Sequence, residues 1–278
     1  MYEPLFAVSR RVVVGALALS VLACGQVDPV SPAANGGASA GTGSSSGAAA
    51  GSGGVNPGAT PPGTPLAWGA DGFVASATNP YAIEGPFYAY SDCDPPSGLP
   101  CTAPDVTLTG ADGKPGWSVN PSKVCMKGTA VKVEGGMFSL QWGAGLALDL
   151  NSKGGEPGQP AVKATFNLEQ AKIKGFSVDI EGTAPAQIRI NLTMPGVADS
   201  NFVNAQVPGT KTFNVADAKQ GNWVKSLTPL DPTHVEAMQF QVFTTAGAPT
   251  PYDFCVSAIR VLSDSVAPTN TGGAAAGG

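Results

Sequence analysis

Gly175-Phe176-Ser177-Val178-Asp179-Ile180 alternates apolar and polar side chains with a period of two residues. Successive side chains of a β-strand point to opposite faces, so this alternation is typical of a strand with one face in a core. The pattern recurs at 131–133, 146–150, 188–192 and 238–242, between clusters of Gly, Pro, Asn and Asp. No amphipathic run of helical length competes with these segments. We therefore expect an all-β fold, a β-sandwich of the jelly-roll type, with one short helix at most at 168–172 and a single turn at 231–234.

The composition agrees with a strand-rich domain and excludes several partners. Glycine and proline together account for 62 of the 278 residues (37 + 25), and the apolar fraction of 42% suffices for one sizeable core. The formal net charge is −5 and no polybasic run occurs, so we expect no nucleic-acid partner. A single histidine excludes a metal site built from several histidines.

The first 23 residues read as a cleaved targeting segment. Arg10 and Arg11 precede an apolar run that is too short to span a membrane. Val21-Leu22-Ala23-Cys24 resembles a bacterial lipobox, in which the chain is cut before the cysteine and Cys24 is lipidated. The alternative is an ordinary secretory signal whose cysteine packs in the core. The paired arginines also resemble, weakly, a twin-arginine signal, so the general secretory and twin-arginine routes both stay open.

Residues 24–65 are expected to form a disordered tether behind the lipidated cysteine. From Gln26 to Pro65 the chain is almost purely Gly, Ala, Ser, Thr and Pro, which cannot bury a core. Such a chain reaches roughly 35 Å root-mean-square. The lack of aspartate after Cys24 resembles lipoproteins of the Gram-negative outer membrane, so we expect a lipid-anchored protein there, periplasmic or surface-facing. Residues 66–265 form the β-sandwich domain and 266–278 a disordered tail.

Four cysteines remain once Cys24 carries lipid, an even number in an exported chain. Four cysteines allow three pairings. We favour Cys93 with Cys101, which closes a proline-rich loop, and Cys125 with Cys255, which joins an early strand to the last one. Free buried thiols are the alternative.

The positions opposite the apolar face of the predicted strands form an unusual set for a plain solvated face. They are Asp149, Ser177, Asp179, Glu181, Arg189, Asn191, Gln239 and Gln241, with the aromatic residue Phe243 beside them. Amide, guanidinium and carboxylate groups on rigid strands suit sugar hydroxyls, because each hydroxyl both donates and accepts a hydrogen bond. Aromatic rings can stack on the apolar face of a pyranose. Trp142 is the best-placed ring, ahead of Tyr81, Tyr88, Phe202 and Trp223. The alternative is a satisfied inter-strand network with Trp142 in the core.

The order of several segments resembles the galactose-binding-like jelly roll of carbohydrate-binding modules and the related complex I intermediate-associated protein family. The resemblance covers about residues 123–262 and rests on these segments: 142–146, 148–151, 175–180, 188–190, Trp223 with 230–232, 238–242 and 252–259. In that superfamily the matching strands line a concave face that receives a glycan, which implies this role for Asp179, Arg189, Gln239 and Gln241. A structural calcium ion is frequent in such modules, but its acidic ligands are not matched here, so the metal content stays open and no other cofactor is expected.

Together these features predict an envelope-anchored lipoprotein with a non-catalytic domain that binds polysaccharide or oligosaccharide. The expected ligand-binding residues are Trp142, Asp179, Arg189, Asn191, Gln239 and Gln241. The first alternative is a structural or protein-interaction lipoprotein of the cell envelope. The second is a glycoside hydrolase or polysaccharide lyase, for which Asp149, Asp179 and Glu181 would be the carboxylates. Nothing in the sequence signals an apolar pocket that would raise the pKa of one of them, so no catalytic residue is assigned.

Overall fold

The computed structural model describes residues 62–93, 98–153 and 162–264. The regular structure of these residues is almost entirely strand, with two short 3₁₀ turns, η1 (Ser76–Thr78) and η2 (Val215–Asp217). No helix in this part of the chain is long and apolar enough to cross a membrane. The predicted signal segment, Cys24, residues 24–61 of the tether and the tail lie outside the described residues, as does Ser265. The expectation that the tether is disordered as far as Pro65 is wrong at its end, because Thr64–Pro65 form β1, which pairs with β15 (Thr250–Ser263).

Two antiparallel sheets form the domain. Sheet I contains, in spatial order, β13 (Gly209–Asn214), β10 (Ile173–Ala184), β15 (Thr250–Ser263), β6 (Lys123–Ala130) and β4 (Ala103–Pro104), with β1 (Thr64–Pro65) beside β15 and β5 (Trp117–Asn120) beside β6. Sheet II contains β12 (Asn201–Gln206), β11 (Gln187–Thr193), β14 (Ala237–Val242), β7 (Ala144–Asp149), β3 (Gly85–Ser91) and β2 (Phe73–Val74). A separate pair is formed by β8 (Ser152–Lys153) and β9 (Val162–Lys163).

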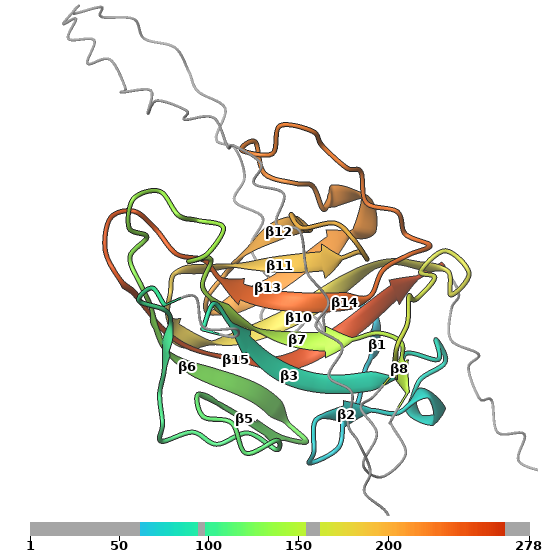
Figure 1. The fold of residues 1–278 in the computed structure, drawn as a ribbon. Coiled ribbons are helices and arrows are strands. Elements are labelled where there is room, and N and C mark those ends of the chain that lie inside the picture. Colours follow the sequence, from blue (N-terminus) through green and yellow to red (C-terminus); the bar gives the residue numbers. More distant parts are fainter. Residues whose placement is uncertain (1–61, 94–97, 154–161, 265–278) are drawn as a thin grey trace, which may run out of the picture. The chain divides into compact units, whose positions relative to one another are not determined.

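The chain crosses repeatedly between the sheets, which is the connectivity of a jelly roll. It passes from β6 in sheet I to β7 in sheet II, back to β10, on to β11, and finally from β14 in sheet II to β15 in sheet I. In Figure 1 the strands β12, β11, β14, β7 and β3 face the viewer, and β10 and β15 run behind them. The expected all-β sandwich is confirmed.

The core lies between the two sheets and is built from the apolar positions of the predicted strands. Phe176, Val178, Ile190 and Phe240 are completely buried, and each is followed by a residue that points out of the core. The period-two pattern is therefore confirmed for 176–180, 188–192 and 238–242. Residues 146–149 belong to a strand as expected, β7, but every residue of this strand is buried, so the expectation that it is half-buried is wrong.

Two local predictions are wrong. Strand β6 ends at Ala130, so 131–133 is not a strand, and only Lys132 forms an isolated bridge, to Thr245. Residues 168–172 form hydrogen-bonded turns instead of a helix, because Lys172 takes a left-handed φ of 56° and Ile173 then enters β10. The turn expected at 231–234 is present, closed by a hydrogen bond from the His234 amide to the Asp231 carbonyl.

Both expected disulfides are confirmed. Cys125 and Cys255 are directly paired positions of β6 and β15, separated by 130 residues of chain. Cys93 and Cys101 are eight residues apart and close the loop that follows β3. The Cys125–Cys255 bridge therefore links β15 covalently to its neighbour β6. The Cys93–Cys101 bridge fixes the loop at the end of β3 in sheet II.

Candidate functional site

A groove of about 1200 Å³ runs across the outward face of sheet II. Two rows of side chains cross this face from β11 to β3, as the strand register dictates. The first row is Arg189, Gln241, Gly145 and Tyr90, and the second is Asn191, Gln239, Ala147 and Tyr88. The residues from β7, Gly145 and Ala147, have small or no side chains, whereas the residues at the two ends of each row have larger ones that project further from the sheet. This difference in side-chain size hollows the face.

The floor of the groove depends on the absence of a side chain at Gly145. A Cβ atom there would collide with the Tyr90 hydroxyl and with the carbonyl oxygen of Phe240. Glycine thus lets the Tyr90 ring lie across the neighbouring strand.

The amides in the groove orient one another. Gln241 Nε2 donates to the Trp142 carbonyl at 3.2 Å, and Gln241 Oε1 accepts from Asn191 Nδ2, also at 3.2 Å. Gln239 makes no side-chain hydrogen bond to another described residue and is only half-buried. The groove therefore contains a fixed pair of amides beside a third whose donors and acceptor face the cavity.

Aromatic rings stand at both sides of the amides. Tyr90 and Trp142 stack with ring centroids 5.5 Å apart, and Phe202 and Trp223 stack at 5.7 Å. Trp223 is 53% exposed, which is unusual for tryptophan. Burial raises the pKa of the Tyr90 phenol, so this hydroxyl stays neutral and can donate a hydrogen bond.

Arg189 lies among three rings that we call the aromatic box. Its Cζ atom is 4.7 Å from the ring centroids of both Phe202 and Trp223 and 4.3 Å from that of Phe243. These are distances at which a cation is attracted to an aromatic face. Burial lowers the pKa of Arg189, and no neighbouring charge contributes to this shift.

The other end of the groove carries a small charged cluster. Lys163 Nζ lies 3.0 Å from Asp149 Oδ1 and 4.0 Å from Glu236 Oε2, and Tyr88 donates to Asp149 at 3.2 Å. Burial and the nearby Asp149 raise the pKa of Tyr88. Burial alone would lower the pKa of Lys163, but Tyr88 and Asp149 outweigh it and raise this pKa. Lys163 is therefore charged and already paired within the protein.

The structure gathers five of the six predicted binding residues in this groove: Trp142, Arg189, Asn191, Gln239 and Gln241. The expectation that Asp179 shares their face is wrong. Asp179 lies on β10 of sheet I, where it accepts hydrogen bonds from Arg260 at 2.7 Å and Thr210 at 2.8 Å. The hydrogen bond from Arg260 lowers the pKa of Asp179.

The other polar residues of β10 follow Asp179 away from the groove. Ser177 is fully buried and accepts a hydrogen bond from Thr212, and Glu181 pairs with Lys123 at 3.3 Å. Period-two alternation shows which side chains point out of a core, but not which of two sheets carries them. The carboxylates considered for a hydrolase are consequently divided between opposite sides of the sandwich.

Several ring residues of the groove had only weak sequence signals. Tyr88, Phe202 and Trp223 were secondary candidates, and all three line the groove, whereas Tyr81 does not. Tyr90 was not singled out, although Phe87-Tyr88-Ala89-Tyr90 alternates and predicts rings on one face of a strand.

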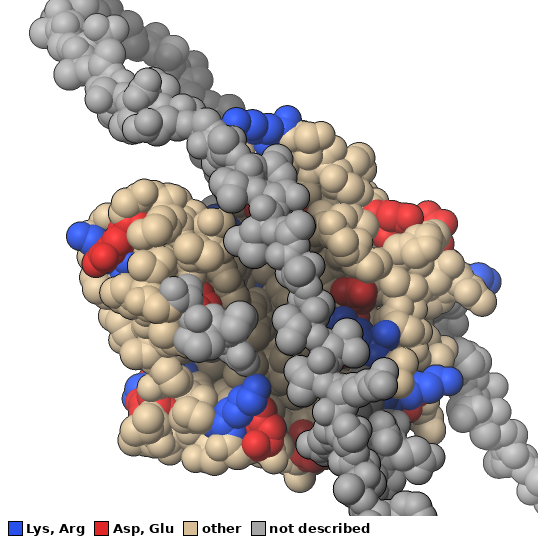
Figure 2. Space-filling model, viewed as in Figure 1, with Lys and Arg blue, Asp and Glu red and all other residues tan. Residues whose placement is uncertain are grey.

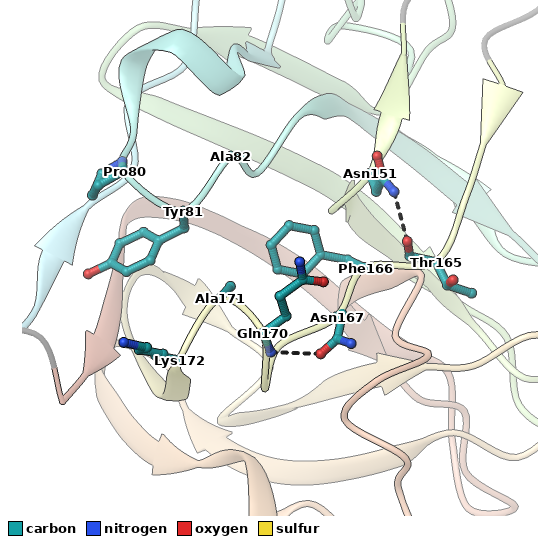
Figure 3. A pocket seen from close by; sticks show the side chains of 10 residues that line it. All are labelled: Pro80, Tyr81, Ala82, Asn151, Thr165, Phe166, Asn167, Gln170, Ala171 and Lys172. Atoms are coloured by element: carbon teal, nitrogen blue, oxygen red, sulfur yellow. Dashed lines mark hydrogen bonds between the residues drawn. The ribbon is translucent and has the colours of Figure 1, made fainter.

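A second cavity, of about 630 Å³, lies elsewhere on the domain and includes Tyr81. The segment with Tyr81 lies opposite the turn that carries Asn167 and Gln170 (Figure 3). Polar groups there are used internally: Asn151 donates to the Thr165 carbonyl at 2.7 Å, and the Gln170 amide donates to Asn167 Oδ1 at 2.8 Å. This cavity therefore offers fewer free hydrogen-bonding groups than the groove.

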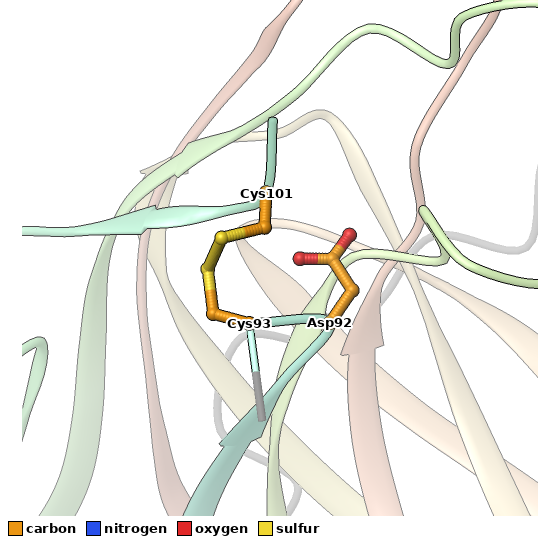
Figure 4. Close-up of side chains that lie close together, drawn as sticks. All are labelled: Asp92, Cys93 and Cys101. Atoms are coloured by element: carbon orange, nitrogen blue, oxygen red, sulfur yellow. A yellow bond between two sulfur atoms is a disulfide. The ribbon is translucent and has the colours of Figure 1, made fainter. Parts of the chain in front are cut away.

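Asp92, Cys93 and Cys101 form the one cluster among the described residues whose atoms could geometrically hold a metal ion. Figure 4 shows the Asp92 carboxylate beside the disulfide. Both sulfurs are bonded to each other, and the Asp92 oxygens accept from the Thr102 amide at 2.7 Å and the Gly143 amide at 3.0 Å. The cluster thus anchors the backbone next to Trp142, and its carboxylate is in use.

Charge on this side of the domain is sparse and mixed. In Figure 2 most of the visible described surface belongs to uncharged residues; basic and acidic side chains adjoin at the left and along the lower edge, and a small basic group stands alone at the top. No single-sign patch is visible there that would attract a densely charged polymer.

Comparisons with known proteins gave matches among solved structures. No family model and no curated protein matches the chain. The family 11 carbohydrate-binding module of the cellulosomal cellulase Lic26A-Cel5E of Clostridium thermocellum is 13% identical, with 64% of this chain and 87% of that chain covered and a TM-score of 0.36. The family 11 module from Clostridium thermocellum in complex with a β-1,3-1,4-mixed-linked tetrasaccharide is 12% identical, with 64% and 88% covered and a TM-score of 0.36.

An exo-β-agarase structure is 10% identical, with 65% of this chain and 23% of that chain covered and a TM-score of 0.32. At such identities and TM-scores these similarities assign no function to this chain. What it binds has to be judged from the groove itself.

Proposed function

We propose that this domain binds carbohydrate in the groove of sheet II without catalysing a reaction. The observation that supports the proposal best is the juxtaposition of stacked aromatic rings with planar amides on rigid strands. The pair Tyr90 and Trp142 offers a flat apolar surface, and Asn191, Gln239 and Gln241 lie between it and the aromatic box. Sugars present the complementary chemistry, because a pyranose has an apolar face and a rim of hydroxyls.

Each amide suits a hydroxyl group for a specific reason. A hydroxyl donates one hydrogen bond and accepts others, and a glutamine side chain offers two donors and one acceptor. Gln239 has these groups unused within the described residues, and Gln241 is held by Asn191 and the Trp142 carbonyl. Asn191 and Gln241 are already held by hydrogen bonds on paired strands, so little of their conformational entropy is lost when a ligand binds.

The carboxylates in the groove support a non-catalytic role. Glycoside hydrolases use two carboxyl groups that flank the scissile bond, one of them protonated at neutral pH. Asp149 Oδ1 is already engaged within the protein, by Lys163 Nζ at 3.0 Å and by the Tyr88 hydroxyl at 3.2 Å. Such an arrangement suits a structural ion pair better than a general acid.

We expect Gln239→Ala and Gln241→Ala each to weaken retention by a bound polysaccharide about tenfold, since each removes hydrogen bonds of roughly 1 to 1.5 kcal/mol. The measurement is the mobility of the purified protein in native gels loaded with neutral and acidic plant, algal and bacterial polysaccharides. Gln206→Ala is the matched control, because Gln206 is an exposed glutamine of the same sheet that does not line the groove.

Thermal melts of the same variants separate a binding defect from a folding defect. If a polysaccharide retards the wild-type protein and retards the folded Gln239→Ala and Gln241→Ala variants equally, the groove is excluded as the binding site.

We further infer that the domain is held at the outer membrane through a lipid on Cys24. The inference rests on Val21-Leu22-Ala23-Cys24 after a basic and apolar segment, and on the Gly- and Ser-rich residues that follow. The partner of the amino-terminal part of the chain is then the membrane, and the sandwich is the part that reaches the glycan.

Cys24→Ser is expected to move the protein from the membrane fraction to the soluble fraction and to abolish incorporation of labelled palmitate. The reason is that a thioether-linked lipid cannot form on a serine hydroxyl. Ser45→Ala in the same segment is the control and should change neither result. A Cys24→Ser protein that still sediments with membranes and still carries label would contradict the anchor.

A further inference from the structure

The described part of the chain contains two arginines, and they differ in one respect. Arg260 has a carboxylate partner within the protein, Asp179, at 2.7 Å. Arg189 has no acidic group within ion-pair distance among the described residues, and its Nε atom is enclosed without a hydrogen-bond partner there. Two lysines, Lys114 and Lys163, also line the groove, and Lys163 is paired with Asp149 and Glu236. Arg189 is therefore the guanidinium of the groove that lacks a counter-charge.

The surroundings of Arg189 make this lack significant. Phe202, Trp223 and Phe243 approach its Cζ atom within 4.3 to 4.7 Å, which removes water from the faces of the guanidinium. The cation–π attraction to the rings offsets part of the free energy lost with that hydration. The rings provide no negative charge, however, and they accept no hydrogen bond in the plane of the guanidinium. A partly desolvated cation is costly unless it is paired.

The part of Arg189 that remains available is the edge of its fork. Its two Nη atoms make no hydrogen bond to a described residue, and they are not among the buried atoms that lack partners, so they keep access to the groove. A guanidinium edge matches a carboxylate, because two parallel N–H groups can bind its two oxygens.

The rest of the groove limits how much negative charge a ligand can carry. Lys163 lies at the opposite end with its partners Asp149 and Glu236. Asp199 also lines the groove, where its Oδ1 accepts a hydrogen bond from Trp223 Nε1 at 3.4 Å, so further acidic groups along a ligand would lie near carboxylates of the protein. Between the two ends are the uncharged residues Gln239, Gln241 and Ala147. From β11 to β3 the rows extend over three strand spacings, roughly 14 Å, which exceeds one sugar ring.

We propose that the ligand is a glycan in which an isolated uronic acid is flanked by neutral sugars, with its carboxylate paired to Arg189 and the neutral sugars over Gln239 and Trp142. The proposal rests on the carbohydrate-binding function proposed above and specifies its substrate class.

The test compares two forms of one polysaccharide. Glucuronoxylan is a neutral xylan backbone with scattered uronic acids, and carboxyl reduction converts each carboxylate to a hydroxymethyl group while the backbone and branching stay the same. We expect the wild-type protein to bind the native form about tenfold or more tightly than the reduced form, because a charge-assisted bidentate contact is lost. Affinities are measured by calorimetry and in polysaccharide-loaded native gels.

Three variants assign the difference to a residue. Arg189→Gln should bring the two affinities to the same value, and Arg189→Lys should retain a part of the preference, since a lysine keeps the charge without the fork. Arg260→Gln removes the same charge from the other sheet and should leave the preference unchanged. The wild-type comparison does not depend on whether any variant folds.

The outcomes separate this proposal from the previous one. Equal binding of native and reduced glucuronoxylan by the wild-type protein, in a manner that still requires Gln239, would overturn the uronic-acid proposal and leave the groove as the sugar site. Tighter binding of polygalacturonate than of glucuronoxylan would overturn the requirement for an isolated charge. Failure to bind any polysaccharide would contradict the proposed function and this proposal with it.

Discussion

Replacing Cys125 and Cys255 together by alanine is expected to lower the free energy of unfolding by about 5 kcal/mol. The bridge closes a loop of 130 residues, and the loss of loop entropy in the unfolded chain grows with loop length. For a domain of this size the melting temperature should fall by roughly 10 to 20 °C. Urea denaturation and thermal melts of the purified protein measure both quantities.

The second disulfide is a matched control for the first. Cys93 and Cys101 are only eight positions apart, so replacing both by alanine should cost roughly 2.5 kcal/mol, about half as much. Equal losses from the two double variants would show that loop entropy does not govern their contributions and that local strain or packing does.

Asp92→Ala is expected to destabilise the domain by about 3 kcal/mol and to weaken glycan binding as well. Asp92 is 3% exposed, and its carboxylate accepts hydrogen bonds from the backbone amides of Thr102 and Gly143. Removal of the carboxylate leaves two buried N–H groups without their partner, each costing roughly 1 to 3 kcal/mol. Gly143 follows Trp142 directly, so the ring that stacks on Tyr90 loses a fixed backbone.

Asp92→Asn distinguishes loss of charge from loss of hydrogen bonding. Its amide oxygen can still accept from one backbone amide, whereas its NH₂ group cannot accept from the other. We expect a stability loss between those of the wild type and Asp92→Ala, measured by urea denaturation alongside native-gel retardation. A stable Asp92→Ala protein with unchanged retardation would show that Trp142 is positioned by other contacts, such as those of Gln141, whose side chain binds Glu134 and Pro100.

The strands and disulfides could be predicted from sequence because their signals are local or arithmetical. Phe176, Val178 and Ile180 alternate with polar residues within a single segment, and the pattern needs no knowledge of any partner strand. The pairing of Cys125 with Cys255 followed from an even cysteine count and from the strands on which they lie.

The binding face was predictable only in part, because a strand pattern does not specify its sheet. Asp179 and Arg189 occupy equivalent outward positions of β10 and β11, yet the chain passes from sheet I to sheet II between them. Residues 131–133 show a second limitation, which is that a short pattern is weak evidence. Two apolar residues that flank a lysine match the alternation, yet β6 ends at Ala130 and these residues form no strand.

Nothing in the sequence indicated that the three rings of the aromatic box would meet around Arg189. Phe202, Trp223 and Phe243 stand on a strand and two separate loops, and they meet only because β12, β11 and β14 are neighbours. The lack of an ion pair at Arg189 was equally invisible, because Asp199 and Glu236 both line the groove and yet neither pairs with this arginine.

The position of β15 determines when sheet I can be completed as the chain is synthesised. This strand, Thr250–Ser263, is the last of the described strands in sequence, yet it lies between β10 and β6 and also pairs with β1. A chain is synthesised from its amino end, so β15 is absent from the middle of sheet I until residue 263 has been added. Until then, the edges of β6 and β10 that pair with β15 are unpaired. All strands of sheet II precede β15 in the sequence, so the strand order delays the completion of sheet I and not that of sheet II.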